Sequence, residues 1–215
     1  MIVCFCSCDD FLETVPQDKV TEENFWQSES DALKFLTDIY SRTLKTDGTG
    51  SITYDEAMSD NAHMVWDWYG GQQQVANGTL TSYSDVPYNI WANSYENIRK
   101  CYQFLENVER VPELSEDLKN RMLGEVHFML AYNYNQLVLY FAEVPLVDKV
   151  LTVEESKNLT QASKTEVVDF IVSQLDLASG LLNGKQMDWG RITWGGHVRL
   201  LKRVFYYFRV IGPGR

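Results

Sequence analysis

The clearest pattern of hydrophobic and polar positions lies between residues 118 and 147, where apolar side chains recur every three or four positions. Two neighbouring stripes result, one of Leu118, Met122, Val126 and Met129 and the other of Leu123, Leu130, Leu137 and Phe141. Ser115 followed by two acids is typical of a helix start, and Pro145 indicates where the helix has ended. Because the second half is apolar or aromatic on nearly every face, the pattern predicts a helix buried within a stack of helices.

Three further segments carry helical apolar stripes, and they predict helices over residues 30–44, 90–108 and from 163 to about 183. The stripes consist of Leu33, Leu36, Tyr40 and Leu44, of Trp91, Tyr95, Ile98, Tyr102 and Leu105, and of Val167, Ile171, Leu175, Ala178 and Leu182. Ser163 and Glu166 have the spacing of a capping box at the start of the third helix. Helices that follow one another across short links predict an all-α fold, a tetratricopeptide-like array of helical hairpins.

Residues 46–89, between the first two predicted helices, show no sustained period and are rich in Gly, Asn and Ser. A long irregular loop inside a compact domain is often functional. Sugar rings are bound by flat aromatic faces together with a few planar polar groups, and the region from Tyr54 to Trp91 supplies both. The candidate glycan-binding residues are Trp66, Asp67, Trp68, Tyr69, Asn77 and Trp91. In the alternative interpretation, these aromatic residues pack the loop against the helices, and the residues alone leave both readings open.

Composition limits the classes of function. The chain of 215 residues is 45% hydrophobic, which indicates a globular protein, and its formal net charge of -11 argues against binding to nucleic acid or to anionic lipid. Three of the four cysteines lie at positions 4, 6 and 8, so neither a disulfide framework nor a zinc site is expected.

An enzyme is a weaker hypothesis than a binding protein. Asp60 and Asp67 could act on a glycosidic bond, but nothing in the sequence sets their separation, and acids in a loop of an acidic chain more often face solvent. The three histidines are scattered, and the chain has neither a phosphate-binding loop nor a dinucleotide fingerprint. We therefore expect no catalytic residues, no cofactor and no metal.

The first residues form a short apolar run that ends at a small residue, Ser7, directly before Cys8. The run is far too short to span a bilayer, and it has the character of the tail of a secretory signal peptide. Phe5-Cys6-Ser7-Cys8 reads as a degenerate lipobox, which would make Cys8 a lipidation site. An incidental apolar N-terminus explains the run equally well when it is taken alone.

Several short motifs follow one another along the chain in the order in which they occur in one known family. They are Cys8-Asp9-Asp10-Phe11-Leu12-Glu13, Tyr95-Glu96-Asn97-Ile98-Arg99, Glu125-x-x-Phe128 with Ala131-Tyr132 and Tyr140, Val144-Pro145-Leu146, and Gly190-Arg191-Ile192-Thr193. Together they resemble the SusD/RagB family from Cys8 to about Tyr207. The sequence departs from the family pattern at Leu130, where arginine is usual, and at Ala142, where glycine is usual.

The resemblance implies a lipoprotein of the outer membrane of Bacteroidetes that binds a polysaccharide or oligosaccharide and delivers it to a TonB-dependent, SusC-like transporter without chemistry. It implies that residues 1–7 are the remnant of a lipoprotein signal peptide, that Cys8 carries the lipid anchor, and that residues 8–207 form the N-terminal helical domain. Residues 208–215 depart from the family, whose C-terminal domain is expected to be absent. The alternative is a helical-repeat protein-interaction module without a ligand of its own.

Overall fold

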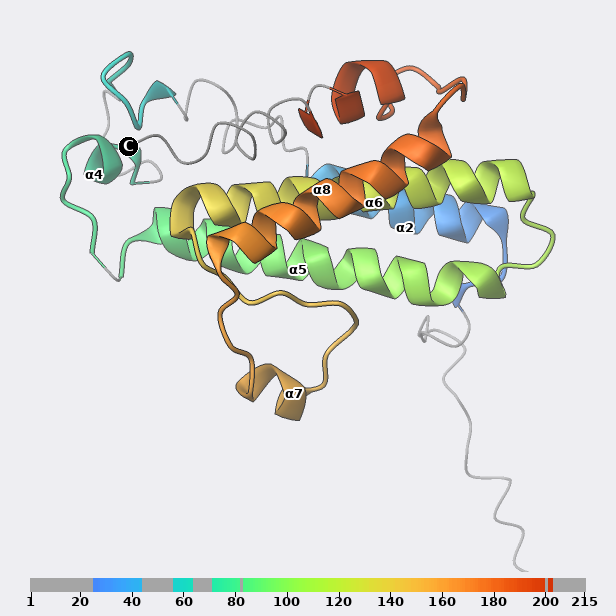
Figure 1. Cartoon of the computed structure of the whole chain (residues 1–215), viewed down its shortest axis with the longest axis horizontal. Coiled ribbons are helices and arrows are strands. Elements are labelled where there is room, and N and C mark those ends of the chain that lie inside the picture. Colours follow the sequence, from blue (N-terminus) through green and yellow to red (C-terminus); the bar gives the residue numbers. More distant parts are fainter. Residues whose placement is uncertain (1–24, 44–55, 64–70, 82, 200, 203–215) are drawn as a thin grey trace, which may run out of the picture.

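The computed structural model describes residues 25–43, 56–63, 71–81, 83–199 and 201–202 (Figure 1). Its α-helices are α2 (Glu29–Thr43), α4 (Gln72–Ala76), α5 (Asp85–Asn107), α6 (Glu116–Phe141), α7 (Val153–Lys157) and α8 (Lys164–Leu182). A 3-10 turn, η2 (Val108–Arg110), follows α5, and a π-helical turn, η3 (Trp194–Val198), follows α8. Within these ranges the only β-type pairing is an isolated antiparallel bridge between Val144 and Ala162. The predicted all-α fold is confirmed.

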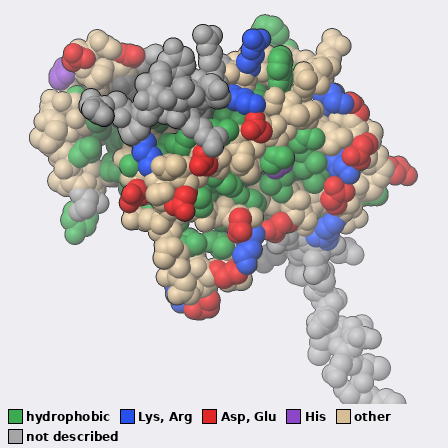
Figure 2. All heavy atoms as spheres, in the orientation of Figure 1, with side chains coloured by type: hydrophobic (Ala, Val, Ile, Leu, Met, Phe, Trp, Pro, Cys, Tyr) green, Lys and Arg blue, Asp and Glu red, His purple; other side chains and the backbone are tan. Residues whose placement is uncertain are grey.

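Helix α6 lies at the centre of the stack, as its sequence predicts. It packs most extensively against α8, also against α5, and more narrowly against α2 (Figure 1). The two predicted stripes meet these neighbours, and Met122, Met129 and Leu137 are fully buried. Figure 2 shows acidic and basic side chains interspersed on the visible face, with hydrophobic side chains exposed between them.

The ends of α6 show how local chemistry sets its length. The hydroxyl of Ser115 caps the first turn by accepting a hydrogen bond from the backbone N–H of Leu118 at 3.3 Å. At the other end the helix stops at Phe141, and Ala142 has φ of 60° and ψ of -65°. Alanine therefore occupies a left-handed conformation at the position where the sequence departs from the usual glycine.

The other predicted helices are also present, with one difference in extent. Helix α8 begins at the predicted capping box, in which Ser163 and Glu166 satisfy each other's backbone N–H groups. Helix α5 begins at Asp85, five residues before the predicted start, so that it takes in Pro87. Proline is tolerated in the first turn of a helix because the N–H groups there have no partner within the helix. The loop that the sequence predicts over residues 46–89 thus contains α4 and the first residues of α5.

Within the ranges that the structure describes, no helix is long and apolar enough to cross a bilayer.

Candidate functional site

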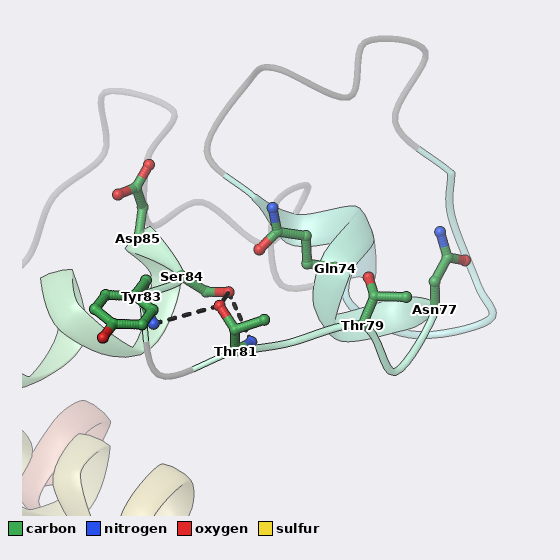
Figure 3. A pocket seen from close by; sticks show the side chains of 7 residues that line it. All are labelled: Gln74, Asn77, Thr79, Thr81, Tyr83, Ser84 and Asp85. Carbon is green, nitrogen blue, oxygen red and sulfur yellow. Dashed lines mark hydrogen bonds between the residues drawn. The ribbon is translucent and has the colours of Figure 1, made fainter.

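A polar pocket of about 460 Å³ lies between α4 and the beginning of α5, within the region that the sequence singles out as functional (Figure 3). Seven residues line it, namely Gln74, Asn77, Thr79, Thr81, Tyr83, Ser84 and Asp85. Two carry amides, three carry aliphatic hydroxyls, one is a phenol and one is a carboxylate. The lining is therefore dense in groups that hydrogen-bond to alcohols.

Two glycines in left-handed conformation shape the α4 side of the pocket. Gly71 has φ of 74°, and a Cβ atom at this position would lie 3.4 Å from Val86 of α5, so α4 begins close against α5. Gly78 has φ of 67° and ends α4. After it, the N–H of Thr79 donates to the carbonyl of Gln74 at 2.9 Å, and the N–H of Gly78 donates to the carbonyl of Val75 at 3.1 Å. These two bonds form a Schellman motif, which turns the chain back along the floor of the pocket.

A tight hydroxyl turn forms the α5 side. The hydroxyl of Ser84 accepts a 2.9 Å hydrogen bond from the backbone N–H of Thr81, and the hydroxyl of Thr81 accepts one of 3.3 Å from the N–H of Tyr83 (Figure 3). The two hydroxyls also lie 3.3 Å apart. Both hydroxyls are therefore used in hydrogen bonds that stabilise this turn, and Ser84 is almost fully buried.

The remaining polar groups of the lining are available to a ligand. Gln74 and Asn77 project from α4, and Tyr83 and Asp85 project from the other wall (Figure 3). The side chains of these four residues make no hydrogen bond to any part of the protein that the structure describes. Tyr83 is 93% exposed, so its flat aromatic ring is open to solvent at the edge of the pocket. This combination of free amides and an open ring suits the hydroxyls and apolar faces of a sugar.

The segment 56–63 is attached to the same end of the molecule. A ring nitrogen of His63 lies 3.2 Å from the side-chain nitrogen of Gln73 in α4, and the hydroxyl of Tyr140 contacts the sulfur of Met58 at 4.0 Å. Gln73 is buried beside the pocket. His63 therefore supports the wall and is not part of the lining.

The structure places two of the six predicted glycan-binding residues. Asn77 lines the pocket. Trp91 lies further along α5, outside the pocket, with its ring centroid 5.1 Å from that of Phe141 and 4.9 Å from that of Tyr95. The other four, Trp66, Asp67, Trp68 and Tyr69, lie outside the described residues, and so does the predicted lipidation site Cys8.

Sequence reasoning did not select most of the lining. Gln74, Thr79, Thr81, Ser84 and Asp85 are polar residues without a periodic pattern, and nothing in their spacing indicates that they face one another. The available signal was the pair of glycines, Gly71 and Gly78, on either side of a short glutamine-rich run. Such glycines often mark tight turns, which bring separate polar segments together.

The lining of the pocket differs from the active site of a typical glycoside hydrolase. One carboxylate, Asp85, lines it, whereas glycoside hydrolysis ordinarily uses two. Asp60, the described member of the acidic pair considered from the sequence, is exposed and does not line the pocket. In the described part of the chain no three His, Cys, Asp or Glu residues are grouped so that they could hold a metal ion.

Comparisons with known proteins place the chain in a family. Residues 10–189 match the model of a SusD-like family described as starch-binding and associating with the outer membrane. A SusD-like protein of Formosa agariphila is 26% identical over 184 residues, which is 85% of this chain and 36% of that protein.

Solved structures agree with the sequence match. A SusD-like protein from Bacteroides fragilis has a TM-score of 0.75 at 27% identity, over 91% of this chain and 38% of that one. A laminarin-binding SusD-like protein has a TM-score of 0.74 at 28% identity, over 85% of this chain and 41% of that one. The chain thus spans well under half the length of these relatives. By its sequence and its fold, it belongs to the SusD-like family.

Proposed function

We propose that the protein captures a polysaccharide or oligosaccharide at the outer membrane, with the pocket between α4 and α5 as part of its binding site, and delivers it to a TonB-dependent, SusC-like transporter. The observation that carries this proposal is the set of side chains that make no hydrogen bond within the described protein, Gln74 and Asn77 on one side of the pocket and Tyr83 and Asp85 on the other. Amides both donate and accept hydrogen bonds, as sugar hydroxyls do, so they orient a sugar without reacting with it. Membership of a family described as starch-binding supports the same ligand class.

The proposal includes no chemical step. A carrier has to release its ligand unchanged, and a pocket that offers amides, hydroxyls and a phenol around one carboxylate is suited to reversible binding. Trp66, Asp67, Trp68 and Tyr69 precede α4 directly in the sequence, and we propose them as additional contacts of the same ligand. Trp91 remains a candidate contact from the sequence alone.

Binding is tested by affinity electrophoresis of the whole gene product through gels that contain single polysaccharides, with laminarin first because a 28% identical relative binds it. Asn77→Ala and Gln74→Ala should each weaken retardation several-fold, because each removes hydrogen bonds to the ligand, of about 1 kcal/mol apiece. Trp189→Ala is the matched control, since Trp189 is fully exposed outside the pocket. If the pocket variants migrate like the wild type in every gel that retards it, the pocket is not the glycan site.

The anchor and the transporter are tested separately. Cys8 should incorporate an alkyne-labelled fatty acid in cells that express the gene with its signal peptide, and Cys8→Ala should not. A tagged wild-type protein, solubilised from outer membranes, should copurify with a TonB-dependent transporter. Labelling that survives in Cys8→Ala would refute the anchor, and purification without any transporter would refute delivery.

A further inference from the structure

We infer that the glycan bound at this site carries no anionic groups, and that the charge of the site selects against sulfated and uronate-containing polysaccharides. The inference rests on the proposed function and specifies the class of glycan that the site binds.

Lys and Arg are unevenly distributed along the sequence. Residues 46–98 contain no Lys or Arg, although the chain has 19 of them. The same stretch contains seven acids, namely Asp47, Asp55, Glu56, Asp60, Asp67, Asp85 and Glu96.

The structure shows that the negative charge near the pocket is not neutralised by the described residues. Asp85 lines the pocket, and neither it nor Asp60 or Glu56 forms an ion pair with any Lys or Arg that the structure describes. Glu96 alone among the described acids of this stretch has a cationic partner, Arg42 at 2.6 Å. In Figure 2 the visible surface of the segment 56–63 shows acidic side chains and a histidine.

The first two cations after this stretch are engaged elsewhere. Arg99 donates a hydrogen bond to the backbone carbonyl of Leu151 at 3.3 Å. Lys100 forms an ion pair with Asp38 at 2.5 Å and lies 5.4 Å from the centre of the Phe35 ring. Neither lines the pocket, so neither is placed to bind a sulfate or a carboxylate there.

Recognition of an anionic sugar requires cationic side chains or clustered N–H donors, not an acidic lining. Sulfate and carboxylate groups are bound by Arg, Lys or clustered N–H donors, which supply charge-assisted hydrogen bonds. Among the described residues that line the pocket, the one charged side chain is Asp85. It repels such groups, because like charges within several ångströms interact unfavourably even at the high effective dielectric of a protein surface. The amides of Gln74 and Asn77 and the ring of Tyr83 carry no charge and suit neutral hydroxyls and apolar sugar faces.

The test compares matched ligands on the whole gene product. Laminarin, mannan and xylan are each presented beside a chemically sulfated derivative of the same chain length, and dissociation constants are measured by calorimetry at about 20 mM salt. The neutral form of the bound polysaccharide should bind at least about tenfold more tightly than its sulfated form, which corresponds to about 1.4 kcal/mol. Raising the salt to about 1 M reduces the screening length to about 3 Å, so affinity for the sulfated form should recover. If the sulfates were excluded sterically, the affinity for the sulfated form would stay low at high salt.

A substitution at Asp85 tests whether the preference for the neutral polysaccharide arises in the pocket. Asp85→Asn removes the carboxylate, and the ratio of neutral to sulfated affinity should fall several-fold, whatever happens to the affinity for the neutral form. Glu154→Gln on the exposed surface of α7 is the charge-matched control, and it should leave the ratio unchanged.

The outcomes separate this inference from the proposed function. A sulfated form that binds as tightly as its neutral parent, a preference that persists in full at high salt, or an unchanged ratio in Asp85→Asn would overturn the charge selection while leaving glycan binding intact. If neither neutral nor sulfated polysaccharides bind, the proposed function fails, and the inference fails with it.

Discussion

The phenol of Tyr40 in α2 donates a 2.7 Å hydrogen bond to the carboxylate of Glu125 in α6. Glu125 is fully buried, and its second partner is the guanidinium of Arg191, at 2.8 Å. The hydroxyl of Tyr40 in turn accepts a 3.0 Å hydrogen bond from the backbone N–H of Ile192. Two helices and the turn after α8, far apart in the sequence, are thus joined through one carboxylate whose charge is compensated within the core.

Tyr40→Phe should lower the free energy of unfolding by about 1–3 kcal/mol, because it leaves an oxygen of Glu125 and the N–H of Ile192 without this partner. Chemical denaturation in urea measures the loss. Tyr88→Phe is the control, since Tyr88 is 69% exposed, and it should change the stability by less than about 0.5 kcal/mol. Equal stabilities of the two variants would show that the buried bond contributes nothing.

Glu125→Gln should also lower the free energy of unfolding, by about 1–3 kcal/mol at neutral pH, because the amide nitrogen cannot accept a hydrogen bond and leaves a donor of Tyr40 or Arg191 without its acceptor. Burial raises the pKa of Glu125 above its ordinary value of 4.5, against the opposing effect of Arg191. Above pH 4.5 the folded protein therefore retains this proton more strongly than the unfolded chain, so the contribution of Glu125 to stability falls as pH rises through its folded pKa. The stability gap between wild type and Glu125→Gln should be wider near pH 4.5 than near pH 7. A gap that widens toward pH 7 would contradict the direction of the shift.

Glu155 forms the capping box of the short helix α7 together with Thr152. The Lys149 ammonium, with which Glu155 forms an ion pair, and the backbone N–H and hydroxyl of Thr152 hold the pKa of Glu155 at about 2. The stabilisation that it provides is present above pH 4.5 and is lost as pH falls toward 2. In an NMR titration, Lys149→Met and Thr152→Val should each move this pKa back toward 4.5. Glu166, whose pKa is lowered by Ser163, is the internal control and should keep its value in both variants.

Two glycines offer a matched test of the contact between α6 and α8. A Cβ atom on Gly124 would lie 2.7 Å from Cγ of Leu182, closer than carbon atoms can approach, whereas a Cβ atom on Gly180 would meet nothing within 4 Å. Gly124→Ala should therefore destabilise the protein by about 1–3 kcal/mol through overpacking. Gly180→Ala should stabilise it by about 0.5–1 kcal/mol, because alanine favours the helix. The thermal midpoints of the two variants should move in opposite directions, and a common direction would contradict the packing argument.

The buried helices were predictable because each carries a stripe that has to be covered. The central helix was identified from its apolar faces, and its start from the capping residue Ser115. The network around Glu125 was not predictable, since a lone acid in an apolar helix does not reveal that Tyr40 and Arg191 will reach it. The family resemblance placed these residues in motifs without showing that they touch.

The pocket was predictable only as a region. A five-residue helix of polar residues such as α4 has no apolar stripe, and Pro87 obscured the true start of α5. Aromatic residues were chosen as sugar contacts because sugar rings stack on flat aromatic faces. A hydrophobic core also takes up aromatic side chains, so the sequence does not distinguish the two roles. Trp91 packs against Phe141, while the exposed ring in the lining of the pocket belongs to Tyr83. Positive φ angles at Gly71 and Gly78 bring the walls together, and sequence periodicity does not encode them.

The end of α6 stores backbone strain at Ala142. Its φ of 60° and ψ of -65°, with a 2.7 Å hydrogen bond from the N–H of Glu143 to the carbonyl of Phe141, describe a γ-turn of the rare kind. A side chain in this conformation costs on the order of 1–3 kcal/mol, and glycine avoids most of that cost. Glycine also gives the unfolded chain more freedom, which offsets about 0.4–1 kcal/mol of the gain.

Ala142→Gly should therefore raise the free energy of unfolding by about 0.5–1 kcal/mol, measured in urea, because the relief of strain exceeds the entropic loss. Ala92→Gly, in the regular part of α5, is the control, and it should lower the stability by about 0.5–1 kcal/mol because there glycine brings the entropic loss without any relief. The difference in sign is the signature of strain at one site and its absence at the other. If Ala142→Gly destabilises the protein as much as Ala92→Gly does, the turn after α6 is relaxed, and the departure from the usual glycine has no energetic consequence.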